Sequence, residues 1–328
     1  MKKRTIVSAA LWAAALLCAL LPKPWLAERV SRPLLKLLGR WSAGVPFPIA
    51  EPLVIALIAL FAIALAAALI RCVTLRRASP LARFALDAAM VTGALTLLYL
   101  IVWFPVARTS ALATPTPAQP RQALFALCER LTEQADGLRA LLPDALDYKR
   151  ERIPEAARLA IGAQAPAKLA RYPEWMDALG IAGMLFPFTG EAILDPGEPI
   201  LTLPFAAVHE LAHQLGYGRE DEANYAAYRA CLNGDPFFRY SGTMYALHYA
   251  MNALRLEDSA AWLAQMDAMS PTVRREHERM GGYPEAEIPE RMARLNRVSE
   301  AFLRLSGQDG LKSYGKMVDL LLMDVETP

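Results

Sequence analysis

The sequence predicts a mainly α-helical protein, in which three N-terminal transmembrane helices precede a mostly helical domain with a small β element. Two observations support this prediction. Hydrophobic residues make up 55% of the 328-residue chain, which is high for a soluble protein, and the excess lies before residue 107. After residue 120, apolar residues recur at helical spacing, for example at Leu124, Leu127, Leu131 and Leu138.

Three segments are candidates for membrane spans, at about residues 5–21, 52–70 and 85–106. A span needs about 20 apolar residues to cross a hydrocarbon core of ~30 Å, and the second and third segments meet this length. The first is slightly short and could be a signal peptide. We favour an uncleaved anchor, because Pro22, Lys23 and Pro24 follow it instead of small residues suited to cleavage. Residues 1–106 are therefore expected to form a membrane domain.

Basic residues predict how these spans are oriented. One basic group, Lys2, Lys3 and Arg4, precedes the first span. A second basic group lies in and beside the loop between the other two spans and consists of Arg71, Arg76, Arg77 and Arg83. The positive-inside rule places both groups in the cytoplasm, although basic residues between positions 23 and 51 oppose it. We therefore expect a multi-pass protein of the inner (plasma) membrane, with everything after residue 107 extracytoplasmic.

Residues 31–41 have leucines interspersed with basic residues. This pattern suits an amphipathic helix lying on the membrane surface, and it suits an ordinary packed helix equally well. Further along, residues 107–120 are rich in Pro and Thr and predict a linker, so residues 121–328 would form one domain with its own core. Within it, residues 191–194 lie between turn residues and are either an edge strand, to which an extended peptide backbone could add as another strand, or a loop packed on a helix.

The strongest chemical motif is HELAH, which contains His209, Glu210 and His213. Helix residues four apart share a face, so the two imidazoles can bind one metal ion. Zinc suits two imidazoles and a carboxylate with a water in the fourth position, and Glu210 would act on that water as general base. The alternative is an amphipathic helix with two surface histidines.

The third ligand is expected from a helix that begins after Gly216, a residue suited to ending the first helix. Glu220 and Glu222 are both candidates, and acidic residues are also common in a first helical turn for electrostatic reasons alone. Helical phase favours Glu220, which shares a face with Asn224. Asn224 is then expected to brace a ligating histidine.

The segment HELAHQLGYGREDEANYAAY resembles the gluzincin metallopeptidases, which have HExxH followed by ExxxN or ExxxD. With PFTGEAILDP before it and DPFFRYSGTMYAL after it, the chain is similar to an uncharacterised family of bacterial membrane-anchored proteins that are thought to be peptidase-like. The resemblance covers about residues 182–247. It implies a zincin-like domain, with His209, His213 and Glu220 as zinc ligands and Glu210 as the catalyst. Asn224 stands where many gluzincins have aspartate.

Other residues near the motif are weaker candidates. Tyr240, Tyr245 or His248 could stabilise an oxyanion, with Tyr240 preferred, or they could form a core wall behind the metal. His277 is expected to be solvated. The four cysteines do not suggest a disulfide framework, although Cys128 and Cys231 could pair, and a net charge of +2 gives no nucleic-acid signal.

The sequence thus predicts a membrane-anchored zinc metallopeptidase that acts on a peptide or protein substrate and contacts the lipid bilayer but no nucleic acid. One alternative is a catalytically silent receptor or scaffold that keeps the zinc-binding fold. Another is an intramembrane protease, which is disfavoured because Glu220, Asp221 and Glu222 follow the motif too closely for a membrane span.

Overall fold

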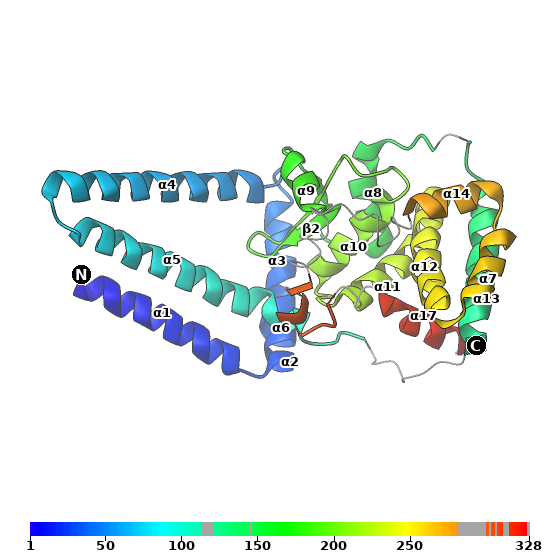
Figure 1. Ribbon diagram of the computed structural model, residues 1–328, viewed down its shortest axis with the longest axis horizontal. Helices are drawn as coiled ribbons and strands as arrows, with labels where there is room; N and C mark the ends of the chain where they lie inside the picture. Colours follow the sequence, from blue (N-terminus) through cyan, green and yellow to red (C-terminus); the bar gives the residue numbers. More distant parts are fainter. Residues whose placement is uncertain are drawn as a thin grey trace.

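The structure is a computed structural model, and it describes residues 1–112, 121–144, 146–280, 300–301, 303–305, 307–310 and 315–326. Three long helices project from a globular part (Figure 1): α1 (Lys2–Leu20), α4 (Ala50–Leu75) and α5 (Ser79–Val102). These three are long and apolar enough to cross a membrane. The predicted membrane domain therefore has its expected number of candidate spans.

The span boundaries differ from the predicted ones because a helix can continue beyond its apolar stretch. The predicted 52–70 segment lies within α4, which runs on to Leu75 and ends at Arg76 in the left-handed conformation (φ 47°). The predicted 85–106 segment is displaced, since α5 begins at Ser79 and ends at Val102. Pro105, which has no N–H to donate, lies in a separate short helix, α6 (Phe104–Ala107).

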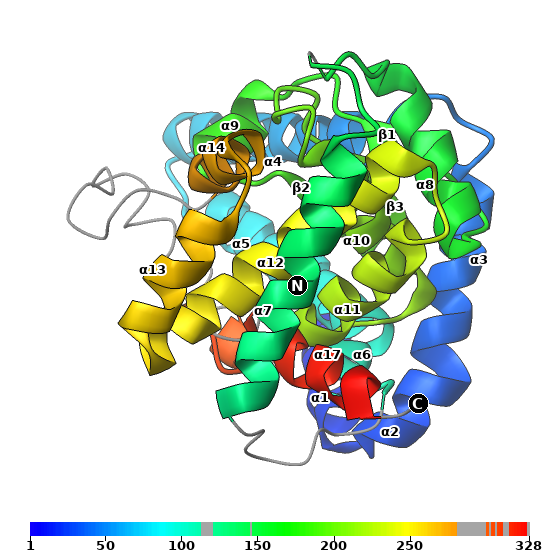
Figure 2. The ribbon, with the colours of Figure 1, turned by 90° about the vertical axis from the view of Figure 1, so that its right-hand side faces the viewer.

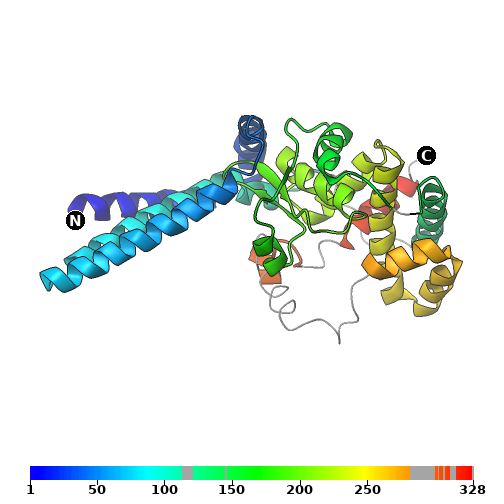
Figure 3. The same cartoon turned by 90° about the horizontal axis from the view of Figure 1, so that it is seen from above.

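The two basic groups lie at the same end of the three long helices, away from the globular part (Figure 1). Lys2, Lys3 and Arg4 begin α1, and Arg76 and Arg77 form the turn from α4 to α5. Helix α1 packs along α5, whereas α4 and α5 separate toward the globular part (Figure 1). All three helices extend from one side of the globular part (Figure 3). Both groups therefore lie at one end of these helices.

Between α1 and α4 the chain crosses the globular end of the spans (Figure 1), in α2 (Lys23–Leu26), a π-helical turn η1 (Ala27–Ser31) and α3 (Arg32–Ser42). Leu35 of α3 is fully buried against Val102 and Trp103 at the end of α5. On the other side of α3, Leu37 and Trp41 are 60% and 64% exposed. The helix therefore packs one apolar face and leaves a second one exposed at this boundary.

The globular part is mostly helical, as expected, and its core surrounds α10 (Leu203–Leu215), which is buried along nearly its whole length (Figure 2). Its described helices are α7 (Arg121–Arg139), η2 (Arg150–Arg152), α8 (Ile153–Ile161), α9 (Glu174–Leu179), α10, α11 (Glu220–Cys231), α12 (Pro236–Glu257), α13 (Ser259–Ala268), α14 (Pro271–Met280) and α17 (Met317–Glu326). The apolar stripe beginning at Leu124 becomes the buried face of α7. Helices α8, α11 and α12 pack against α10.

Three short strands form one sheet in the order β1 (Lys168–Leu169), β3 (Glu191–Leu194), β2 (Gly183–Phe186). The segment 191–194 is therefore a strand, but it is the central one and is buried throughout. The edge position beside α10 belongs to β2, which we did not predict. Its four residues, GMLF, are too short and too uniformly apolar to give a strand pattern.

The start of α4 is tied to this sheet by a buried carboxylate. Glu191 of β3 accepts hydrogen bonds from the backbone N–H groups of Ile49 and Ala50, both at 2.8 Å. Lys168 of β1 lies 2.6 Å from the same carboxylate, and Thr189 donates to it at 2.7 Å. A buried ion pair with all its hydrogen bonds made is costly to separate, so the span and the sheet are joined firmly.

Two further predictions concern the linker and the cysteines. Part of the predicted 107–120 linker is held in place, because residues 110–112 bind the Glu222 carboxylate, while residues 113–120 lie outside the described residues. All four cysteines are free, so Cys128 and Cys231 do not pair. Burial raises the pKa of Cys128 to about 12, which makes it an unreactive core thiol.

Candidate metal centre

Helix α10 carries the HELAH motif and ends where its sequence predicts. Gly216 follows it with φ 99°, and Tyr217 N–H bonds back to the Ala212 carbonyl at 3.1 Å, which closes the last turn. A side chain at Gly216 would also meet Arg32 of α3, at 2.5 Å from its Cγ. Glycine is therefore required here both for the backbone conformation and for the close approach of α3.

The chain then turns into α11, whose first residue is Glu220. A buried glutamine from the C-terminal region holds this turn. Oε1 of Gln308 accepts the Glu220 N–H at 3.0 Å, and its amide nitrogen donates to the Gly218 carbonyl at 3.4 Å. Gln308 thus fixes where α11 begins, and we did not identify it from the sequence because it lies 88 residues from Glu220.

His209, His213 and Glu220 come together as a buried cluster, which we call the His–His–Glu cluster. One ligand atom from each lies within 4.8 Å of the others. Oε2 of Glu220 is 3.3 Å from Nε2 of His209 and 3.5 Å from Nε2 of His213. Both imidazoles therefore direct the same ring nitrogen toward one carboxylate oxygen.

These separations suit a metal ion better than a direct ion pair. Charge-assisted N–H···O bonds are typically about 2.7–2.9 Å long. Tetrahedral bonds of about 2.0–2.2 Å to one zinc ion would instead place neighbouring ligand atoms about 3.3–3.6 Å apart. The donors that face one another are two imidazole nitrogens and one carboxylate oxygen, so the cluster fits zinc in its donor set and in its spacing.

His213 is oriented by its surroundings. Its Nδ1 lies 2.6 Å from the Tyr217 carbonyl, which requires a proton on Nδ1 and leaves Nε2 free for a metal. The Trp103 indole stands edge-on to the His213 ring, with centroids 5.4 Å apart and planes at 77°. The His209 ring packs near Phe205, at a centroid distance of 6.3 Å, and its Nδ1 has no hydrogen-bond partner among the described residues.

The charges of the cluster are strongly coupled. Burial lowers the pKa of His213, but the Glu220 carboxylate more than compensates and raises that pKa to about 9. Burial would raise the pKa of Glu220, yet the neighbouring His213 and His209 hold it well below its usual range. A positive ion is thus expected to replace a proton on His213.

Glu210 is buried beside the cluster, under strand β2. Burial raises the pKa of Glu210, and the backbone N–H of Leu185 donates a hydrogen bond to its carboxylate. Gly183 lies against the same side chain, so that a Cβ there would be 2.7 Å from Glu210 Cγ. The absence of a side chain at position 183 therefore makes room for Glu210.

One edge of strand β2 faces away from β3. Ala182, just before β2, accepts a hydrogen bond from Asp195 just after β3, so alternate residues bond to β3 and the intervening Gly183 and Leu185 face outward. Within the described part of the chain no strand pairs with this outer edge. An extended peptide added there would lie beside Glu210.

The other acidic and amide candidates have different partners. Glu222 accepts hydrogen bonds from the Ser110 hydroxyl and from the backbone N–H groups of Ala111 and Leu112, so it points toward the linker and away from the cluster. Asn224, expected to brace a histidine, hydrogen-bonds the Tyr249 side chain. The expectation for Asn224 was based on helical phase, which cannot place the side chains of α12.

Of the two roles considered for the tyrosines of α12, the structure favours packing for Tyr240. Tyr240 is fully buried, and its hydroxyl donates to Glu276 of α14 at 2.5 Å. Tyr245 stacks on Phe205 at a centroid distance of 4.0 Å. Tyr249 lies close enough to Glu220 for its pKa, raised mainly by burial, to be raised further by that carboxylate. Tyr249 thus lies near Glu220, and we did not single it out from the sequence.

The half-buried His248 and the buried His277 lie side by side, with ring centroids 5.7 Å apart. Neither ring nitrogen of His277 has a hydrogen-bond partner among the described residues, and its side chain is only 6% exposed. The expectation that His277 is solvated was therefore wrong, because α14 packs this face against α12.

Comparison with known proteins identifies one family. A family described as a protein of unknown function (DUF3810) matches residues 27–322, which covers the spans α4 and α5, the sheet and the His–His–Glu cluster. This agrees with the expected resemblance to an uncharacterised family and adds no activity to it. No curated protein and no solved structure matches the chain.

Proposed function

The chain belongs to the DUF3810 family, whose function is unknown, and we propose that this protein is a membrane-anchored, zinc-dependent metallopeptidase. The observation that carries the proposal is the spacing of the His–His–Glu cluster, 3.3 and 3.5 Å from the Glu220 oxygen to the two imidazole nitrogens. The adjacent carboxylate of Glu210 and the outer edge of β2 supply the other parts that peptide hydrolysis needs.

His209, His213 and Glu220 would hold the zinc ion. When bound, zinc supplies Lewis acidity and lowers the pKa of a bound water toward ~7. Glu210 would take the proton of the attacking water and deliver it to the leaving amine. Its raised pKa suits this role, because a base whose pKa approaches the working pH can both accept and return a proton.

The substrate would bind as an extra strand on the outer edge of β2. The backbone groups of Gly183 and the carbonyl of Leu185 face this edge, so they would align a peptide by main-chain hydrogen bonds, largely without regard to its sequence; the Leu185 N–H is already donated to Glu210. The hydroxyl of Tyr249, on the α12 side of the cluster, is our candidate for stabilising the oxyanion in place of Tyr240.

The proposed topology places the catalytic part outside the cytoplasm. Helix α10 is not one of the three candidate spans, which argues against an intramembrane protease. The basic ends of α1 and of the α4–α5 turn lie opposite the globular part (Figure 1), and the positive-inside rule assigns them to the cytoplasm. A reporter fused after Arg77 should then be active only in the cytoplasm.

The test of the activity uses the full-length protein in detergent, loaded with zinc, and a library of generic peptides analysed by mass spectrometry. We expect peptide-bond cleavage that Glu210→Gln abolishes while zinc content stays at one per chain, because an amide cannot accept the proton. Zinc binding without any cleavage would instead favour a catalytically silent receptor or scaffold. A wild-type protein unable to take up zinc would refute both.

A further inference from the structure

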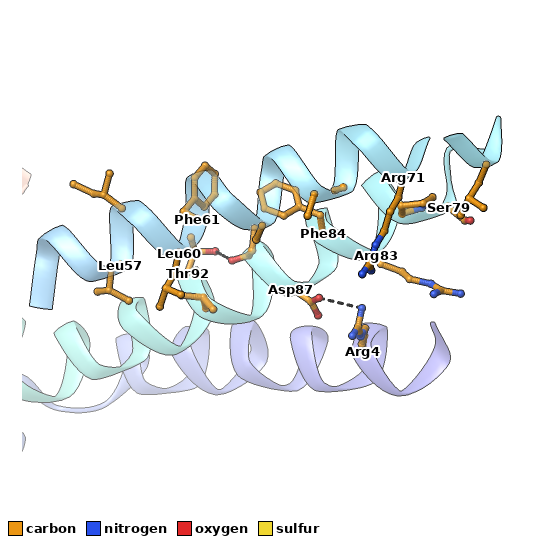
Figure 4. A pocket seen from close by; sticks show the side chains of 18 of the residues that line it. Arg4, Leu57, Leu60, Phe61, Arg71, Ser79, Arg83, Phe84, Asp87 and Thr92 are labelled. Carbon is orange, nitrogen blue, oxygen red and sulfur yellow. Dashed lines mark hydrogen bonds and ion pairs between the residues drawn. The ribbon is translucent and has the colours of Figure 1, made fainter. Parts of the chain in front are cut away.

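A large groove lies between the diverging spans α4 and α5, far from the His–His–Glu cluster. Its volume is about 1560 Å³, and it extends from Leu57 to the turn between the two helices. Alanines at positions 64, 67 and 68 line the α4 side, so no large side chain fills the space there. Phe61 and Phe84 meet edge-on across it, with centroids 5.2 Å apart (Figure 4).

The two ends of the groove differ in chemistry. Leu57, Leu60 and Phe61 lie toward one end and Arg71, Ser79 and Arg83 toward the other, as Figure 4 shows. At 1.5 Å per residue the fourteen-residue step from Leu57 to Arg71 is roughly 20 Å long, enough for an acyl chain in one leaflet of a ~30 Å core. The groove is therefore an apolar channel with a basic end.

That basic end carries excess positive charge. Four arginines line the groove (Arg4, Arg71, Arg77 and Arg83), and its one acidic residue is Asp87. Asp87 pairs with Arg4 at 3.0 Å (Figure 4). The described residues offer no carboxylate partner to the other three arginines within salt-bridge distance. Three guanidinium groups are thus available to an anion.

The first turn of α5 adds to this charge. Ser79, the first residue of α5, lines the groove, and the N-cap residue Ala78 has no side chain able to accept from the first-turn N–H groups. The N-terminus of this 24-residue helix carries a partial positive charge. A phosphate seated near Ser79 would interact with both the arginines and the helix end.

From this arrangement we propose that the α4–α5 groove binds an anionic phospholipid, with one acyl chain between the helices and the phosphate among Arg71, Arg77 and Arg83. A lipid fits this groove because its apolar part, which would hold an acyl chain, continues directly into its basic end, which would hold a phosphate. The basic end lies with the N-terminus, on the side assigned to the cytoplasm, where anionic headgroups attract basic residues.

The test is native mass spectrometry of the full-length protein in neutral detergent, titrated with phosphatidylglycerol or with phosphatidylcholine of the same acyl chains. We expect one tightly retained phosphatidylglycerol and weaker retention of phosphatidylcholine. Since each basic residue near an anionic headgroup contributes roughly fivefold, changing Arg71, Arg77 and Arg83 together to Gln should weaken binding about a hundredfold.

Two matched controls keep the proposal falsifiable. Ala64 lines the groove and Ala62 does not, so Ala64→Trp should expel the lipid with all arginines present, whereas Ala62→Trp should retain it. Changing the exposed Arg29, Lys36 and Arg40 to Gln removes the same charge at the other end of the spans and should leave the bound lipid in place. The proposal would be overturned if this control variant lost the lipid as readily as the groove variant, or if the protein bound both lipids equally well. It would also be overturned if the wild type were a dimer that Ala64→Trp dissociated, because a second copy would then occupy the groove.

Discussion

The Trp103 indole stands nearly perpendicular to the His213 imidazole, with ring centroids 5.4 Å apart. Trp103 directly follows the span α5, so only one side chain separates the end of a candidate span from a candidate metal ligand. Trp103→Ala should loosen this ring and weaken zinc binding about tenfold, as loss of an orienting neighbour does, while Trp103→Phe should largely preserve it. Competition with a chelating dye measures the affinity. The control is Trp41→Ala, whose side chain is 64% exposed; an equal effect there would contradict the contact.

Alanine substitutions of Glu220 and Glu222, at the start of α11, should have different effects. Glu220→Ala should lower zinc affinity by several orders of magnitude, because one of three ligands is lost. Glu222→Ala should retain zinc but lower stability by about 2–4 kcal/mol, because the N–H groups of Ala111 and Leu112 lose a buried charged acceptor. Metal content and the thermal midpoint are the two measurements. Loss of zinc in Glu222→Ala but not in Glu220→Ala would show that Glu222, and not Glu220, is the third ligand.

Gly183 should be needed for activity but not for metal binding. A Cβ at position 183 would lie 2.7 Å from Glu210 Cγ, so Gly183→Ala should displace the general base and reduce kcat at least tenfold with zinc retained. By contrast, a Cβ added at Gly137 in α7 would meet no atom within 4 Å. Gly137→Ala should therefore keep full activity and raise stability by about 0.5–1 kcal/mol. Equal kcat in the two variants would refute the contact.

The tyrosines of α12 provide a matched pair of hydroxyl deletions. Tyr249→Phe should lower kcat, with a smaller effect on KM, if its hydroxyl stabilises the oxyanion. Tyr240→Phe should leave kcat unchanged and lower the thermal midpoint, since it removes only the hydrogen bond to Glu276. Peptide-cleavage kinetics and thermal unfolding of both variants test this, and the reverse pattern would restore Tyr240 as the site residue.

Metal binding should release a proton at neutral pH. The pKa of His213 is raised to about 9 in the metal-free protein, so the imidazole is protonated at pH 7 and must lose that proton to bind zinc. Apparent affinity should then rise about tenfold per pH unit up to about pH 9. Calorimetry in two buffers with different ionisation enthalpies counts the protons released, and a heat independent of the buffer would contradict the assignment.

The same proton affects the stability of the metal-free protein. The pKa of His213 in the folded protein exceeds its unfolded value of about 6.5. The protonated imidazole therefore stabilises the folded, metal-free protein, and this stabilisation is fully present below pH 6.5. It is lost as the pH rises through about 9. The thermal midpoint of chelator-treated protein should therefore decrease as the pH is raised from 7 to 10. The zinc-loaded protein should not show this decrease.

The sequence by itself determined the parts that depend on local pattern. Apolar length gave three candidate spans, helical spacing placed His209 and His213 on one face, and Gly216 ended α10 because a positive φ is inexpensive only for glycine. Each of these depends on interactions between residues that are close in the chain.

Only the tertiary structure decided which distant side chains meet these elements. Strand β2 became the edge above Glu210 because β3 lies between it and β1, and Tyr249 came to lie beside Asn224 because α12 packs on α11. Gln308 lies 88 residues after Glu220 and Trp103 lies 110 residues before His213, yet both reach the site. Such contacts depend on how helices and strands pack across large sequence separations, and neither periodicity nor residue type records that packing.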